Sequence, residues 1–401
     1  MTTVHRPSLE LEASLSTIHQ SPKQWTEPDQ FDLGSIADKN ELARRINNGS
    51  IRHSVDRAAE IADDLFELRH PDQRSDDEAR LDFTSDIVNS GLEYGSWFHF
   101  PWSESVVRYP EVEDHQDLRT FRNKNLITHE EQVRLLGATA AIFGLSVGSN
   151  VTEQLVLSGI GGTVVMGDFD KLTPANTNRV KAGMPQVGME KIDIVAIKTS
   201  EVDPYIKQVH LRDGITEAGL EQLADANPDI IFDEIDDLAM KALLRQFAAD
   251  HRIPLVMATD LGDKSLIDVE RYDIDDTTKP FHGKVREADF EKMLKGSMTE
   301  KEKSKYLIRI LGVQHLTARI LGSVVEIDRT LAGIPQLGTT ASTGGSLATV
   351  AAREILLGRK MDSGRYVLSP RAVLGLQRHT SVKEGFKTLG AFKAHMKNQA
   401  N

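Results

Sequence analysis

The central part of the chain alternates between short apolar runs and amphipathic stretches. The apolar runs are the length expected of strands buried in a parallel sheet, and the stretches between them place apolar residues at helical spacing. The predicted strands are 139–143, 163–166, 208–211, 229–232 and 254–257, and the predicted helices are 149–158, 187–201, 216–225 and 237–250. This alternation predicts an α/β fold with a Rossmann-like, doubly wound and mostly parallel sheet.

The segments on either side carry different patterns. Residues 1–34 mix Pro, Ser, Gln and acidic residues without periodicity, so we expect an extended or disordered tail. Residues 35–120 are expected to form a helical N-terminal appendage, a candidate for substrate recognition, and the nucleotide-binding domain is expected at 121–275. Residues 276–401 are predicted to supply C-terminal helices for dimerisation and acceptor binding.

Smaller features of these flanking segments also carry predictions. An amphipathic helix is predicted over 55–68. The aromatic cluster 97–102 is interpreted as core packing rather than as a surface that grips a peptide. A Gly/Thr/Ser-rich segment, 338–345, precedes a predicted helix over 347–357, and the segment 344–349 is either a flexible flap or a helix N-terminus at a dimer interface.

Composition narrows the range of functions. The formal net charge of −12 leaves no basic footprint for nucleic acid and no polybasic patch for a membrane surface, and no apolar run is long enough to span a membrane. The sequence contains no cysteine, which excludes disulfides, a cysteine-ligated zinc site and a thioester on this chain. We therefore expect a cytoplasmic protein that binds neither nucleic acid nor membranes.

A glycine-containing turn lies between the first predicted strand and the first predicted helix. Gly144 and Gly148, followed by Ser149, would let backbone N–H groups approach a phosphate at the helix N-terminus. Asp168 and Asp170 follow the second strand, where a ribose-binding acid belongs in such a fold; a surface turn is the alternative for Asp168. The turn by itself predicts a nucleotide site of unspecified kind.

Downstream residues favour a triphosphate as the ligand. Arg179, after Asn176 and Asn178, and Lys191 on the next helix supply positive charge. Activation of a carboxylate with ATP requires such charge close to a metal-binding carboxylate, because negative charge must be stabilised as pyrophosphate leaves.

Two acids after the buried strand 229–232 are candidates for that carboxylate. Asp236 or Asp237 could hold Mg²⁺. Alternatively, Asp236 is only the N-cap of the helix that begins at Leu238.

In this order, the residues resemble the ThiF-type adenylating family, which includes ubiquitin-activating enzymes and activators of sulfur-carrier proteins. The resemblance covers about 120–270 and continues more weakly to 360. The matching positions are Gly144, Gly148, Asp168, Asp170, Asn176, Asn178, Arg179, Gly188, Lys191 and Asp236. The resemblance implies that Asp168 holds the ribose, that Arg179 and Lys191 contact phosphates and that Asp236 serves Mg²⁺. It also makes Arg122 the candidate that reaches the phosphates of a partner subunit; the alternative for Arg122 is a solvated basic residue before a helix.

The chain departs from the family pattern in three ways. The glycine turn is one residue shorter, with Ser146 and Val147 where two glycines are usual. The absence of cysteine removes the zinc site and the acceptor thiol of many members. Residues 1–120 do not match the usual members and suggest an appendage that grips a peptide, as in members that modify ribosomally made peptide precursors.

The leading hypothesis is an ATP-dependent adenylyltransferase that uses Mg²⁺ and activates the carboxylate of a peptide or small protein as an acyl adenylate, in a homodimer. The alternatives are an NAD- or FAD-dependent oxidoreductase and a non-catalytic nucleotide-binding scaffold. The loop 259–263 is expected to border the acceptor pocket, because α/β folds place ligand-contacting loops at strand ends. His282 is interpreted as a structural hydrogen-bonding residue rather than a catalytic one.

Overall fold

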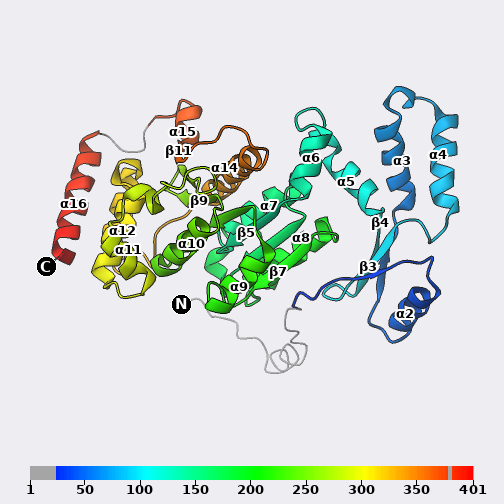
Figure 1. Ribbon diagram of the computed structural model, residues 1–401, viewed down its shortest axis with the longest axis horizontal. Coiled ribbons are helices and arrows are strands. Elements are labelled where there is room, and N and C mark those ends of the chain that lie inside the picture. Colours follow the sequence, from blue (N-terminus) through cyan, green and yellow to red (C-terminus); the bar gives the residue numbers. More distant parts are fainter. Residues whose placement is uncertain (1–23, 378–381, 401) are drawn as a thin grey trace, which may run out of the picture.

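A seven-stranded sheet forms the centre of the molecule. The computed structural model describes residues 24–377 and 382–400, with the sheet between the N-terminal appendage and the C-terminal helices (Figure 1). The sheet has the order β11-β10-β9-β8-β5-β6-β7. Its strands are β5 (Thr139–Phe143), β6 (Thr163–Gly167), β7 (Lys207–Leu211), β8 (Ile230–Asp233), β9 (Leu255–Asp260), β10 (Ser265–Glu270) and β11 (Gly364–Leu368). Strands β5 to β9 pair in parallel, whereas β10 is antiparallel to both of its neighbours.

Helices cover both faces of this sheet. They are α6 (His129–Leu136), α7 (Gly148–Leu157), α8 (Lys191–Val202), α9 (Glu217–Ala226), α10 (Leu238–Asp250) and α14 (Gly338–Leu356). Strand β5 shows the two faces, since Ile142 joins the core with α7, α8 and α14, while Phe143 joins the core with α9 and α10. The predicted doubly wound α/β fold is therefore confirmed, with the predicted strands and helices displaced by a few residues at most.

The structure differs from the predictions after β9. Neither β10 nor β11 is a predicted strand, and α14 begins at Gly338 instead of 347. A Cβ on Gly345 would lie 2.8 Å from the carbonyl carbon of Asn150, so this glycine lets α14 pack closely on α7. Among the described residues, the segment 338–345 is thus the first part of α14, and 344–349 lies inside this helix instead of forming a flap or a helix N-terminus.

The prediction of a helical appendage is incomplete, because the appendage contains a four-stranded sheet of order β1-β3-β4-β2. Its elements are β1 (Asp29–Phe31), α2 (Ile36–Asn47), β2 (His53–Val55), α3 (Ala58–Arg69), α4 (Asp77–Asn89), β3 (Ser96–Phe100), β4 (Ser105–Tyr109) and α5 (Val112–Thr120). The predicted tail therefore overlaps β1, and residues 1–23 lie outside the described residues.

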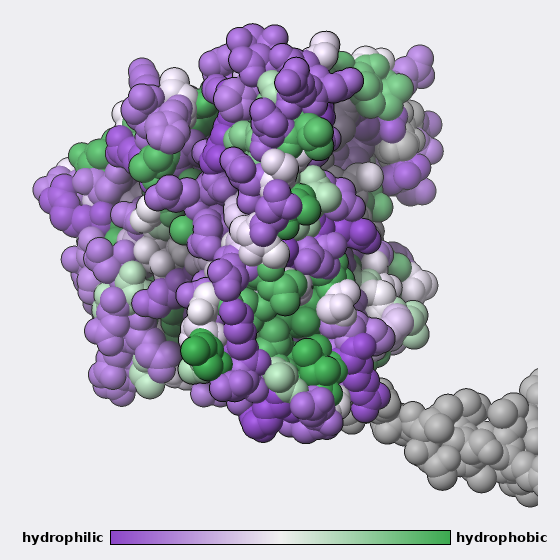
Figure 2. Space-filling model, turned by 90° about the vertical axis from the view of Figure 1, so that its right-hand side faces the viewer, coloured by the Kyte–Doolittle hydropathy of each residue, from purple (hydrophilic) through white to green (hydrophobic). Residues whose placement is uncertain are grey.

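The aromatic cluster of the appendage is core, as predicted. Trp97, Phe98 and Phe100 on β3 are buried. The surface of the molecule on the side of the appendage is mostly hydrophilic, and its hydrophobic residues gather near the lower centre of the view (Figure 2). The indole N–H of Trp102 donates to Glu201 of α8 at 2.8 Å, and the Tyr109 hydroxyl donates to the Glu201 carbonyl, also at 2.8 Å. These contacts fix the appendage to the central domain.

The C-terminal helices lie at the opposite end from the appendage (Figure 1). They are α11 (Glu287–Leu294), α12 (Glu300–Leu311), α13 (Ala318–Glu326), α15 (Pro370–Val373) and α16 (Val382–Ala400), and α13 packs against α16. Within the described ranges, no helix has the length and apolar character needed to cross a bilayer.

Candidate nucleotide-binding site

The strand order reverses between β5 and β8. From β5 the chain proceeds to β6 and β7 on one side, and it then returns to place β8 and β9 on the other. In open α/β sheets, ligands bind outside the carboxyl ends of the strands at such a switch point. Here the turn after β5 and the loop after β8 meet at that place.

The turn after β5 requires glycine at its first position. Gly144 has φ +86°, and a Cβ there would lie 2.3 Å from the carbonyl oxygen of Glu234, which follows β8. Gly148 begins α7, where a Cβ would lie 2.9 Å from the Ile142 side chain. The N–H groups of Ser146 and Val147 find no acceptor among the described residues, and unpaired donors at a helix N-terminus favour an anion.

Gly144→Ala is expected to lower the free energy of unfolding by about 2–4 kcal/mol. The new Cβ would stand on a left-handed backbone and would collide with the backbone of Glu234, directly after β8. Urea unfolding measures the change. Gly296→Ala is the matched control, since Gly296 also has positive φ but no other segment of the described chain comes within 4 Å of the position that its Cβ would take. Equal losses in both variants would contradict a role for the close approach.

Asp168 lies directly against this turn. Its carboxylate accepts the Leu145 N–H at 2.5 Å and the Asp170 N–H at 2.7 Å. Burial raises the pKa of the Asp168 carboxyl, although Lys191 and these two N–H groups oppose the rise. Asp168 therefore orders the turn, and ribose binding remains a prediction for it.

The structure brings Arg179 to the same turn. Its Nε donates to the Ser146 hydroxyl at 3.0 Å and its Nη1 donates to the Asn178 side chain at 2.9 Å. The side chain of Asn176 instead accepts the N–H of Thr173 at 3.2 Å and caps its own loop. Ser149 also serves local structure, because its hydroxyl donates to the Ser146 carbonyl at 2.8 Å.

Lys191 begins α8 and is already paired. Its ammonium lies 2.7 Å from the Asp170 carboxylate; Lys191 is buried, and the Asp170 side chain is 57% exposed. A nucleotide phosphate would have to share Lys191 with Asp170 or displace it.

The two acids after β8 have different environments. Asp237 caps α10, because its carboxylate accepts the N–H groups of Ala239 and Met240 at 2.9 and 3.0 Å. The predicted cap thus exists one residue later than Asp236. Asp236 is exposed and its carboxylate makes no hydrogen bond or ion pair with any other described residue, so it is the freer of the two to bind a cation.

Arg122 does not join this site within the chain. It lies exposed in the short 3₁₀ turn Phe121–Asn123, where the neighbouring Asn123 side chain donates to Ser158 at 3.3 Å. Ser158 follows α7 at the end opposite to the glycine turn. Contact between Arg122 and phosphates therefore needs a second chain.

Two carboxyl groups at the site were not among the predicted site residues. Glu234 accepts the Ala258 N–H at 2.7 Å, and burial raises its pKa well above the ordinary range. At the end of β9, both carboxylate oxygens of Asp260 are inaccessible and make no hydrogen bond among the described residues. Burial raises the pKa of Asp260 to about 6, and the positive charge of Arg179 opposes the rise. The position of Asp260 after a strand was the only signal in the sequence.

Asp260→Asn is expected to increase the free energy of unfolding at pH 8 by up to about 3 kcal/mol, because burial disfavours the charged carboxylate. The gain should vanish below about pH 3, where both states are protonated, and should develop as the pH rises from the ordinary pKa of 3.8 to the folded value of about 6. Urea unfolding of both chains across this pH range measures the gain, and Asp276→Asn, at an exposed position, is the control. A gain that does not change with pH would contradict the explanation.

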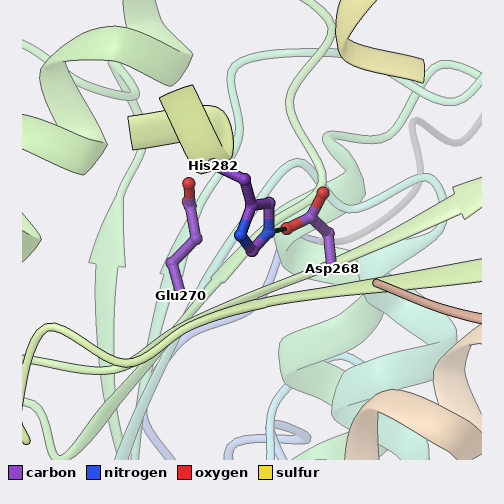
Figure 3. A group of neighbouring side chains, drawn as sticks. All are labelled: Asp268, Glu270 and His282. Atoms are coloured by element: carbon purple, nitrogen blue, oxygen red, sulfur yellow. Dashed lines mark hydrogen bonds and ion pairs between the residues drawn. The ribbon is translucent and has the colours of Figure 1, made fainter. Parts of the chain in front are cut away.

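A second group of charged side chains lies deeper in the molecule. Asp268 and Glu270 on β10 and His282 offer ligand atoms that all lie within 4.8 Å of one another, and His282 hydrogen-bonds Asp268 (Figure 3). Arg245 Nε is 2.7 Å from Glu270, and Arg365 Nε is 2.9 Å from Asp268. Because two arginines already neutralise the two carboxylates, this cluster is an internal ion-pair network.

The surroundings of His282 agree with its predicted structural role. Burial would lower its pKa, but the hydrogen bond and the charge of Asp268 outweigh this effect, and the pKa is raised. Phe281 and His282 both have positive φ, which is rare for residues other than glycine. The hydrogen bond between the Phe281 N–H and Glu270 holds this segment against β10.

Comparison with known proteins identifies relatives of the central region. The profile of the ThiF family matches residues 120–370. An uncharacterised protein of Mycobacterium tuberculosis is 35% identical over 278 residues, which are 69% of this chain and 38% of that protein. The tRNA threonylcarbamoyladenosine dehydratase of Bacillus subtilis is 29% identical over 160 residues, which are 39% of this chain and 62% of that protein. The chain thus spans less than two thirds of the length of either relative.

Solved structures with a similar arrangement have low sequence identity. The ATP complex of the E. coli tRNA N6-threonylcarbamoyladenosine dehydratase is 18% identical, with a TM-score of 0.42 over 60% of this chain and 95% of that chain. The ATP complex of E. coli MccB is 12% identical, with a TM-score of 0.40 over 60% of this chain and 65% of that chain.

Proposed function

The chain belongs to the ThiF family, and on that premise we propose that it is an ATP-dependent adenylating enzyme. It activates a carboxylate of a peptide or small protein as an acyl adenylate and releases pyrophosphate. The observation that carries the proposal is the meeting of the glycine turn, Arg179 and the loop of Asp236 at the switch point of the sheet.

The residues of this site suit a triphosphate. The N–H groups of Ser146 and Val147, which have no acceptor in the described chain, would face phosphate oxygens at the N-terminus of α7, and Arg179 would add positive charge beside them. Lys191 would contribute once a phosphate competes with Asp170. Asp168 would hold the ribose from its place beside the turn.

A magnesium ion fits the donors present. Mg²⁺ in nucleotide sites is held by one or two carboxylates together with phosphate oxygens. Asp236 is an exposed carboxylate without a partner in the described chain, while one oxygen of Asp237 is engaged in capping α10. We therefore assign the ion to Asp236, where it would offset phosphate charge.

The chemical step is an in-line displacement. A carboxylate oxygen of the acceptor attacks the α-phosphorus of ATP, the bond to the bridging oxygen breaks, and pyrophosphate leaves with the electron pair. Arg179 lies where it would stabilise charge on the phosphates. Because the chain contains no cysteine, the adenylate passes to a nucleophile without a thioester on this chain.

The proposal includes a homodimer. Arg122 lies near the end of α7 that is remote from the glycine turn of its own chain. A role at phosphates, as the family resemblance implies, would need the turn of a second copy.

Ligand-induced thermal stabilisation tests the nucleotide class. ATP with Mg²⁺ is expected to raise the melting temperature of the full chain, whereas NAD and FAD should leave it unchanged, because binding to the folded state alone stabilises that state. Stabilisation by NAD or FAD and not by ATP would favour the oxidoreductase alternative. ATP binding without pyrophosphate exchange for an acceptor that binds would favour the scaffold.

A further inference from the structure

A large cavity opens beside the nucleotide site, between the β9–β10 turn and the C-terminal helices. Its volume is about 950 Å³, and its wall includes Gly262, Leu316 and Ile320. Apolar side chains from three further segments complete it, and they are strongly exposed: Leu337 is 48% exposed, Leu376 51% and Phe386 72%. Apolar residues gathered around a concave surface are typical of a binding site.

Positive charge accompanies these apolar residues. Lys264 and Arg319 line the cavity, and neither side chain forms a hydrogen bond or ion pair with any other residue in the described ranges. The guanidinium of Arg371 lies 3.5 Å from the Asp263 carboxylate, so these two charges in the cavity wall offset each other. The cavity therefore carries two uncompensated cations in a chain whose formal net charge is −12.

The cavity wall adjoins the nucleotide site at two places. Asp260 and Gly262 are two residues apart on the same turn, and Asp260 is close enough to Arg179 for that charge to affect its pKa. On the other side, the Asn178 side chain donates to the Gln336 carbonyl at 2.8 Å, immediately before Leu337. The loop that carries Arg179 thus borders the cavity wall.

We propose that this cavity binds the segment of an acceptor polypeptide that precedes the carboxylate to be activated, and that this segment is apolar and acidic. Leu337, Leu376 and Phe386 would receive its apolar side chains, and Lys264 and Arg319 would meet its acidic side chains. The carboxylate would then emerge past Gly262 toward the phosphates. This inference rests on the proposed adenylating function and names its substrate class.

Charge reversal provides a direct test on the full chain. Two pools of fluorescent dodecapeptides with free carboxyl ends share their apolar positions, and one carries Glu where the other carries Lys. In fluorescence polarisation, the unmodified chain is expected to prefer the acidic pool by at least tenfold. The K264E/R319E variant is expected to prefer the basic pool, and Phe386→Ala should weaken both. Arg57→Glu, on the appendage, is the control that should retain the original preference.

The outcomes separate this inference from the proposed function. The inference is overturned if neither pool binds, or if K264E/R319E keeps the preference of the unmodified chain. The melting temperature with ATP and Mg²⁺ is measured on the same samples. Absence of an ATP effect in the unmodified chain counts against adenylation, whereas a reversed peptide preference in that case would still support the cavity as an acidic-peptide site.

Discussion

Arg179→Ala is expected to lower the rate of ATP–pyrophosphate exchange by about 10²–10³-fold, the usual loss when one donor to developing charge is removed from an enclosed site. The guanidinium of Arg179 is the cation held at the glycine turn, through its hydrogen bond to the Ser146 hydroxyl. The measurement uses acceptor peptides that support exchange by the unmodified chain. Arg179→Lys should recover part of the rate, because it restores charge without the planar donor geometry.

Lys181→Ala is the matched control for this variant. Lys181 follows Arg179 by two residues, and its ammonium pairs with Glu153 at 2.5 Å on the surface. Its removal is expected to change the exchange rate by less than about twofold, since exposed ion pairs contribute little. Equal rates in Arg179→Ala and Lys181→Ala would contradict the assignment of Arg179 to the phosphates.

Arg245→Ala is expected to lower the free energy of unfolding by about 3–5 kcal/mol, because it removes the cation beside buried Glu270 and one of the two cations beside buried Asp233. Arg245 is fully buried between Asp233, at 2.5 Å, and Glu270, at 2.7 Å, and its guanidinium carbon lies 3.9 Å from the centre of the Phe281 ring. Lys241, at 3.1 Å from Asp233, compensates only one of the two acids. Urea unfolding at pH 7 measures the loss.

The pH dependence of this loss is a second readout. Burial alone would raise the pKa of Asp233, but Lys241 and Arg245 hold it below the ordinary value in the native chain. This carboxylate therefore contributes stability above its unfolded pKa, and the contribution disappears as the pH falls through the lower folded pKa. The deficit of Arg245→Ala should shrink in acid, because the native chain then loses the contribution of Asp233, and protonation of Glu270, which does not pair with Lys241, removes the uncompensated charge in the variant. A deficit below about 1 kcal/mol, the range expected for exposed Arg57→Ala, would argue against the network as a source of stability.

The sequence predicted β5, β6, β8 and β9 well because these strands are largely buried on both faces and contain few charges. Strand β10 was missed for the opposite reason. It carries Asp268 and Glu270, and charged residues in a sequence usually indicate a solvent-exposed segment. In the structure, Arg245 and Arg365, which lie far away along the chain, neutralise these two buried carboxylates. Strand β11 is a short edge strand with half-exposed Tyr366 and Val367, so its pattern is not that of a buried strand.

The sequence also predicted part of the candidate site. The glycine turn, Arg179 and Asp168 meet in the structure because each follows a strand of one parallel sheet. The sequence could not distinguish Asp236 from Asp237 as the helix cap, since the two choices differ by one residue of register. Nor could it show the environment of Asp260, because the burial of its oxygens depends on packing between segments far apart along the chain.

The antiparallel pairing of β10 with β11 has a consequence for how the chain can vary among relatives. Val269 lies opposite Gly364, so the chain leaves the sheet at β10 and returns to it one strand away, after α11 to α14. Doubling the length of such an excursion adds only about 0.6 kcal/mol of closure entropy. Relatives can therefore tolerate insertions and deletions between α11 and α13 without disturbing the strands that carry the glycine turn. The region around the proposed acceptor cavity can diverge in sequence while the nucleotide site stays unchanged.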